Sequence, residues 1–113
     1  MNETEHKILA YIQNNCRGRA NAKTFKTLSQ LLLIPERELR LSVAELVTYY
    51  EQPIASDSQN GYYWLDNQEE FEQAHRELMS RIKKLSMRCK GLRKGYAVQK
   101  KEEEVKPYQL EMV

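Results

Sequence analysis

Two runs of cationic side chains, neither containing a carboxylate, are the residues of this sequence best suited to hold an anionic partner. One holds Arg17, Arg19, Lys23 and Lys26, and the other contains seven cations between Arg81 and Lys94. Closely spaced cations repel one another, so phosphate groups or an acidic protein surface would stabilise them. A solvated basic loop and an ordinary solvated helix remain the alternatives for the two runs.

Catalytic and metal-binding patterns do not occur in the sequence. It has no glycine-rich phosphate loop, no nucleophile elbow and no zinc-binding helix motif, and it holds only four glycines. His6 and His75 lack other ligands at a suitable spacing. Cys16 and Cys89 stand far apart, as expected for reduced thiols. We therefore expect a protein that is not an enzyme and that uses no metal and no cofactor.

Length and composition are those of one small soluble domain with additional polar sequence. The chain has 113 residues, 30% of them charged, and a net charge of +2. Its first residues are charged, and no stretch approaches the roughly 20 apolar residues that cross a bilayer. We expect a cytoplasmic protein that does not contact a membrane.

Apolar residues at helical spacing predict three helices in the first half of the chain. The first is expected to start at Thr4, as its N-cap, and to end near Asn15. The second starts after Thr24, and the third runs from about Glu36 to Tyr50. Pro35 places a tight turn between the second and third helices, because proline cannot continue a helix but suits the first turn of the next one.

A β-hairpin is expected after the third helix. Residues 53–56 and 62–65 read as two strands, and the turn at Asp57–Gly61 includes Asn60 and Gly61, which tolerate positive φ. Five aromatic residues lie at the end of the third helix and in the hairpin, and we expect them to cover the core rather than to stack on bases: Tyr49, Tyr50, Tyr62, Tyr63 and Trp64.

A long amphipathic helix is predicted for residues 67–95, opened by a capping box of Asn67 and Glu70. Its apolar stripe begins at Phe71 and continues through six residues at spacings of three and four: Ala74, Leu78, Ile82, Leu85, Cys89 and Leu92. We expect the first half of the stripe to pack on the chain's own domain and the second half to form a homodimer, parallel or antiparallel. Residues 96–113 are expected to be a flexible charged tail.

The order of these elements resembles the winged helix-turn-helix superfamily over about residues 4–65. The segment TFKTLSQLLLIPERELRLSVAELV looks like its helix, turn and recognition helix, and PIAS followed by NGYYW looks like its wing. The whole pattern, including a following helix with LMSRIKKL, is similar to small winged-helix proteins of phages and prophages. The implied fold is mainly α with a small β-hairpin, with a winged-helix domain at residues 1–66 and a long C-terminal helix after it.

The resemblance implies a protein that binds double-stranded DNA in transcription regulation or DNA replication. The third helix would enter the major groove and the turn at Asp57–Gly61 would be the wing tip. The candidate DNA-contact residues of the protein are Arg37, Arg40 and Ala44 on the third helix and Asn60 in the wing. Four further candidates would contact phosphates: Arg17, Arg19, Lys23 and Lys26.

The acidic residues of the third helix depart from what a strong DNA reader needs. Glu36, Glu38 and Glu45 lie on that helix, where Arg37 or Arg40 could pair with Glu36 or Glu45, and the wing tip carries no Lys or Arg. The alternative function is therefore a protein-interaction module that uses the same scaffold to bind a replication or transcription protein.

Overall fold

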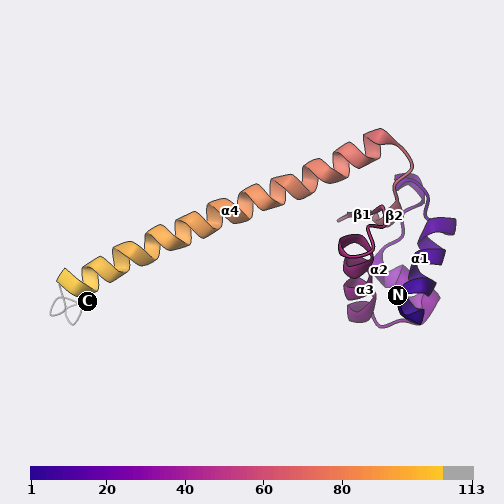
Figure 1. Cartoon of the computed structure of the whole chain (residues 1–113), viewed down its shortest axis with the longest axis horizontal. Coiled ribbons are helices and arrows are strands. Elements are labelled where there is room, and N and C mark those ends of the chain that lie inside the picture. The colour runs from indigo at the N-terminus through magenta and orange to yellow at the C-terminus, as the bar shows by residue number, and fades with distance from the viewer. Residues whose placement is uncertain (106–113) are drawn as a thin grey trace. The chain divides into compact units, whose positions relative to one another are not determined.

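The structure, a computed structural model, describes residues 1–105, with side chains described up to residue 102. Figure 1 shows helices and one antiparallel hairpin, which confirms a mainly helical fold with a small hairpin. The described elements are α1 (Glu3–Asn15), a 3-10 helix η1 (Arg19–Asn21), α2 (Phe25–Leu32), α3 (Glu36–Thr48), β1 (Ile54–Asp57), β2 (Gly61–Trp64) and α4 (Gln68–Val105). The chain divides into two units after His75, and α4 belongs to both.

Helix α1 begins with a capping box two residues earlier than the sequence pattern predicted. The Asn2 side chain accepts the Glu5 N–H at 2.7 Å, and the Glu5 carboxylate accepts the Asn2 N–H at 3.2 Å. Thr4 is therefore not the cap, and its hydroxyl instead donates to Glu38 at 3.4 Å. The Lys7 ammonium donates to the last carbonyl of α2, at Leu32, at 2.6 Å, which ties α1 to α2.

Helices α2 and α3 are joined by the expected tight turn. Thr24 caps α2, as predicted, by accepting the Thr27 N–H at 3.3 Å. Leu33 ends α2 in the left-handed conformation, and Pro35 precedes the first turn of α3. The Ser29 hydroxyl donates a hydrogen bond to the Ile34 carbonyl, and the Ser29 carbonyl accepts one from the Ile34 N–H. A residue of α2 therefore holds the turn.

The core of the first unit lies between α1, α2 and α3, with β1 against it. Helical spacing of three and four places its residues on one face of each helix. It consists of Ile8, Ile12, Cys16, Leu28, Leu32, Ile34, Leu39, Val43, Leu46 and Ile54. Tyr63 is also buried, and Tyr62 and Trp64 are partly buried against the cluster, as predicted for the hairpin aromatics. Tyr49 and Tyr50 are exposed, because α3 ends before them at Thr48, so the prediction of a core role is wrong for these two.

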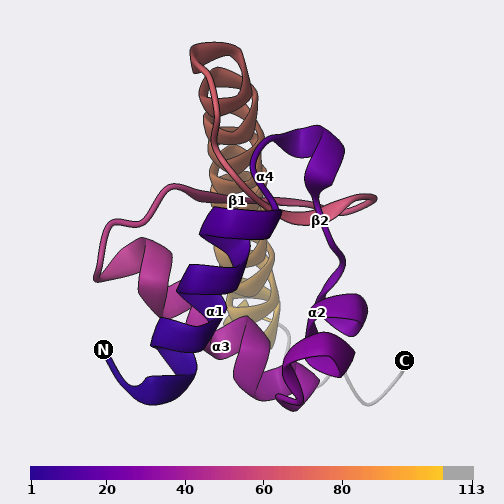
Figure 2. The same cartoon turned by 90° about the vertical axis from the view of Figure 1, so that its right-hand side faces the viewer.

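Strand β2 is hydrogen-bonded on both of its edges. On one side it pairs with β1, in a register that places Ala55 opposite Tyr63. On the other side Trp64 exchanges bonds of 2.8 Å with the backbone of Cys16 and Gly18, and Tyr62 exchanges bonds of 2.8 and 3.1 Å with Lys23. The hairpin is thus fixed to the segment between α1 and α2, and Figure 2 shows it beside the C-terminal end of α1.

The start of α4 is tied to η1 through one carboxylate. Asn67 accepts the Glu70 N–H at 2.9 Å, as expected for a cap. Glu70 does not complete the predicted capping box, because its carboxylate accepts the N–H groups of Asp66 at 3.0 Å and Arg19 at 2.8 Å. Residues 68–75 therefore belong to the first unit together with the loop they hold.

Helix α4 continues past the boundary expected at residue 95. Residues 96–105 are helical, so the prediction of a flexible tail is wrong for them, while 106–113 lie outside the described residues. Tyr96, four residues after Leu92, continues the apolar spacing past residue 95, which favours helix. The expected packing of the stripe's first half is also not found at Phe71, which is 46% exposed and stacks on His75.

Gly61 is the residue most sensitive to a side chain in this fold. At its φ of +100° a Cβ would lie 2.2 Å from the Lys23 carbonyl oxygen. We expect Gly61→Ala to lower the free energy of unfolding by more than Gly18→Ala. Gly18 has a similarly positive φ of +80° but no Cβ contact under 3.6 Å, so Gly18→Ala should cost only the backbone strain of about 1–3 kcal/mol. Urea unfolding of both variants followed by circular dichroism tests this, and equal losses would contradict a close approach at Gly61.

Candidate nucleic-acid interface

Arg40, on the exposed side of α3, is stacked on the first residue of α2. Its guanidinium carbon lies 3.7 Å from the centroid of the Phe25 ring, within the range of a cation–π interaction. The turn between α2 and α3 brings these two residues together, because it folds the middle of α3 back beside the start of α2. Among the described residues Arg40 has no ion pair, so its charge is held in place but not neutralised.

Two hollows in the surface of the first unit share Arg40. The first, of about 320 Å³, opens between the start of α2, α3 and the hairpin, and is lined by Thr24, Phe25, Arg40, Ser56, Asp57, Ser58, Gly61 and Tyr62. The second, of about 420 Å³, runs along the outer side of α3 and is lined by Glu36, Arg37, Arg40 and Leu41. Arg40 therefore lies where a ligand following the outer face of α3 would also meet the hairpin.

Tyr62 contributes a partly buried phenol to the first hollow. Burial raises the pKa of Tyr62, and the positive charge of Arg40 acts in the opposite direction. The two side chains are therefore close enough to interact electrostatically. Tyr62 is consequently a neutral hydrogen-bonding group at physiological pH, placed beside an arginine.

Asp57, the acidic residue of the hairpin turn, is neutralised within the fold. Hydrogen bonds from the Gln59 N–H, the Asn60 amide and Arg19 hold the pKa of Asp57 at about 2. The Arg19 guanidinium reaches the same carboxylate oxygen through Nε at 2.9 Å and Nη2 at 2.6 Å. The turn therefore presents little net negative charge to an approaching phosphate.

Four of the candidate DNA-contact residues are engaged by groups of the protein itself. Arg19 pairs with Asp57, and the Asn60 amide donates to the same carboxylate at 3.0 Å. The Arg17 guanidinium faces Asp66 at 3.6 Å, and the Lys23 ammonium lies 5.9 Å from the centroid of the Tyr11 ring. The first cationic run is thus divided among separate contacts and does not form one patch.

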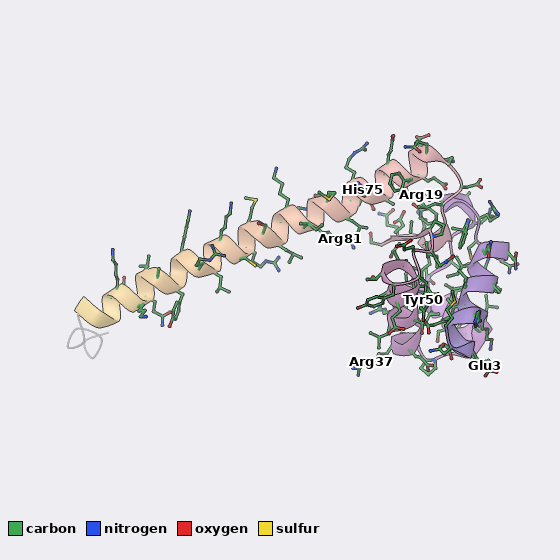
Figure 3. The ribbon with its side chains drawn as sticks, viewed as in Figure 1. Glu3, Arg19, Arg37, Tyr50, His75 and Arg81 are labelled. Atoms are coloured by element: carbon green, nitrogen blue, oxygen red, sulfur yellow. The ribbon has the colours of Figure 1, made fainter. Side chains whose placement is uncertain are left out.

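The remaining candidates are Lys26 on α2 and Arg37, Arg40 and Ala44 on α3, and all four are exposed. Neither the Lys26 side chain nor the Arg37 side chain has a hydrogen bond or ion pair to another described residue. Among the described residues, the possible pairing of Arg37 or Arg40 with Glu36 or Glu45 is not found. Figure 3 shows Arg37 and Arg19 at opposite ends of the first unit. No pattern in the sequence indicates that Phe25 and Tyr62 flank Arg40, since both are typical core residues.

Other types of site find no support in the part of the chain that the structure describes. It contains no group of three or more His, Cys, Asp or Glu side chains that could hold a metal ion. None of its helices is both long and apolar enough to cross a membrane. No known protein family matches the sequence, and neither a curated protein nor a solved structure matches the chain.

The hydrogen bonds that Asp57 accepts, first of all from the Gln59 N–H, predict a specific acid sensitivity. Its pKa is lower in the folded protein than in an unfolded chain, so its stabilisation is complete above pH of about 4 and is lost as the pH falls toward 2. We expect Asp57→Asn to lower stability at neutral pH and to flatten the dependence of stability on pH in this interval. Urea unfolding at several acidic pH values measures this. An unchanged pH dependence in the variant would contradict the assigned role.

A tyrosine titration can test the electrostatic interaction between Arg40 and Tyr62. Removing the positive charge disfavours the phenolate, so Arg40→Ala should raise the pKa of Tyr62 further above its ordinary value. Alkaline absorbance titration of the two proteins shows the change, and Tyr62→Phe identifies the transition that belongs to Tyr62. If Arg40→Ala leaves that transition in place, Arg40 does not lie in the hollow beside the hairpin.

Proposed function

We propose that residues 1–75 are a winged-helix domain that binds double-stranded DNA with α3 in the major groove. The observation that carries the proposal is the position of Arg37 and Arg40. Both are exposed and without an ion pair to a described residue, and Arg40 is held by Phe25 between α3 and the hairpin. Arginine is the side chain that most often reads a guanine edge, and a guanidinium fixed in position loses less entropy on binding.

The arrangement around α3 supports the winged-helix assignment. Helices α2 and α3 follow each other through a tight turn, and the hairpin comes next in the chain and lines the same hollow as Arg40. Backbone pairing of Lys23 with Tyr62 adds a third chain segment beside the hairpin. In this class of protein such a hairpin, the wing, lies beside the recognition helix on DNA.

Electrostatics on this face favour phosphate. Lys26 lies in the first turn of α2, where the partial positive charge of a helix N-terminus also attracts anions. The carboxylate of the turn is occupied by Arg19, so it does not oppose the approach of DNA. In the second hollow itself, the two positive charges of Arg37 and Arg40 face the single acid Glu36.

With the resemblance of the sequence to phage and prophage winged-helix proteins, we propose that this binding serves transcription regulation or DNA replication. The biochemical activity is recognition without catalysis. Lys26 would contact a phosphate, and Arg37 and Arg40 would contact base edges.

A protein-binding role for the same face has one observation in its favour. Leu41 lines the second hollow together with the two arginines and is 60% exposed. Exposed leucine beside arginine is also found in protein interfaces, where both residues can be anchors. This alternative predicts that the face binds no duplex DNA even at low salt.

Arg37→Ala combined with Arg40→Ala tests the DNA proposal. Purified full-length protein would select sequences from a random duplex library, and the affinity for the selected duplex would then be measured by fluorescence anisotropy. We expect the double variant to lose about 30-fold to 10⁴-fold in affinity for it and to prefer it less over random sequence, since each of the two base contacts is worth about 1–3 kcal/mol.

Arg17→Ala is the matched control, because it removes the same kind of side chain from another surface of the first unit. It should weaken binding to all duplexes to the same small extent and leave the sequence preference intact. The proposal fails if the wild type binds no duplex at about 50 mM salt, or if Arg37→Ala with Arg40→Ala has no larger effect on preference than Arg17→Ala.

A further inference from the structure

The part of α4 from residue 78 to residue 101 carries an apolar seam along one side. Its residues are separated alternately by four and three positions, which is the a and d pattern of a coiled coil: Leu78, Ile82, Leu85, Cys89, Leu92 and Tyr96. All six side chains are exposed, with Leu85 at 54% and Leu92 at 76%. A helix gains most of its stability by packing such a face against another element. The seam is therefore a docking face for a second helix.

Cations border this seam on both sides. With Ile82 and Cys89 at a positions, Arg81 and Arg88 take the g positions, and Arg93 and Lys100 take the e positions. Residues at e and g select the partner of a coiled coil through their charges. The segment holds no carboxylate and nine cations, Arg81, Lys83, Lys84, Arg88, Lys90, Arg93, Lys94, Lys100 and Lys101.

A second copy of the chain is a poor match for these borders. In a parallel, in-register pair, Arg88 of each helix would face Arg93 of the other, so two like-charge contacts form. In an antiparallel pair centred on the same segment, Arg88 would face Arg88 of the second copy. The remaining cations add to this repulsion, since neither helix supplies an acid within the segment.

Nucleic acid also matches only part of the surface. Phosphates would satisfy the cations but would leave the leucine side chains of the seam in water. A helix with an apolar seam and acidic borders would satisfy both features at once. Each Arg at g or e would then face a carboxylate, and the a and d side chains would be buried.

We propose that residues 78–101 of α4 bind one helix of a different protein, with an apolar a and d seam and Glu or Asp at its e and g positions. This interface uses residues separate from those that we propose contact DNA. It replaces homodimerisation as the use of Leu78, Ile82, Leu85, Cys89 and Leu92, because the charges that flank them select against a second copy.

Cys89 reports directly on whether the seam is covered. It is an exposed thiol at an a position, whereas Cys16 is buried, and burial raises the pKa of Cys16, which slows its reaction further. The probes are two synthetic peptides of about four heptads with Leu and Ile in the seam, one with Glu and the other with Lys at all e and g positions. We expect the Glu peptide to slow modification of Cys89 in the full chain at least tenfold, and the Lys peptide to have no effect.

Charge reversal at the borders supplies the matched variants. Arg88→Glu with Arg93→Glu leaves two cations and two acids at the e and g positions, so it should weaken protection by the Glu peptide and strengthen protection by the Lys peptide. Lys83→Glu with Lys90→Glu makes the same change in net charge at b positions, away from the seam, and should keep the preference for the Glu peptide. Leu85→Ser should abolish protection by either peptide while leaving residues 1–75 folded.

Three results would overturn the proposal. The first is a full chain that sediments as a dimer and becomes a monomer on Leu85→Ser, which would assign the seam to a second copy. The second is equal protection, or none, by the Glu and Lys peptides. The third is protection of Cys89 by duplex DNA that persists in Leu85→Ser, which would make α4 a nucleic-acid surface.

Discussion

The hydrogen bonding of β2 along both of its edges is the constraint on which the first unit depends. On one edge it holds β1, and on the other it holds the backbone at Cys16, Gly18 and Lys23. This pairing requires glycine at position 61, because the Lys23 carbonyl occupies the place of a Cβ. It also sets the start of α2 beside the hairpin, which is how Phe25, Arg40 and Tyr62 come to line one hollow.

The same attachment determines which cations are available to a ligand. Bringing residues 17–23 against the hairpin and the start of α4 places Arg17 opposite Asp66 and Arg19 against Asp57. Each of these arginines is paired with a carboxylate of the fold. The cations on α2 and α3 lie outside this network, so their charge is directed to the surface. Arg17 and Arg19 are therefore paired within the fold, whereas Arg37 and Arg40 remain available to a ligand.

Much of the fold could be predicted from local rules, and most of the site could not. Thr24, Pro35 and the pair Asn60 and Gly61 mark their elements by chemistry that acts within a few residues. The prediction of Thr4 as the N-cap of α1 is wrong, because Asn2 and Thr4 are both good caps. Only the reciprocal hydrogen bond between Asn2 and Glu5 distinguishes them. The apolar pattern does not predict the end of α4, because it stops near residue 95 whereas the helix continues to Val105.

The contacts that define the site join residues far apart in the chain, so no spacing rule reveals them. Asp57 lies 38 residues from Arg19, and Phe25 read as one more apolar residue of an amphipathic helix. Periodicity did identify the seam of α4, since a long helix exposes its pattern directly in the sequence. What covers that seam depends on a partner's charges, which is why the flanking arginines carry more information than the leucines.

The central claim is that DNA meets the protein where α2, α3 and the hairpin converge on Arg40. Titration of isotope-labelled full-length protein with a short duplex, followed through backbone amide chemical shifts, tests it most directly. The account predicts that the shifts concentrate at residues 24–26, at residues 36–44 and at the hairpin residues near Gly61 and Tyr62. Shifts confined to α4 beyond residue 76, or none at low salt, would contradict it.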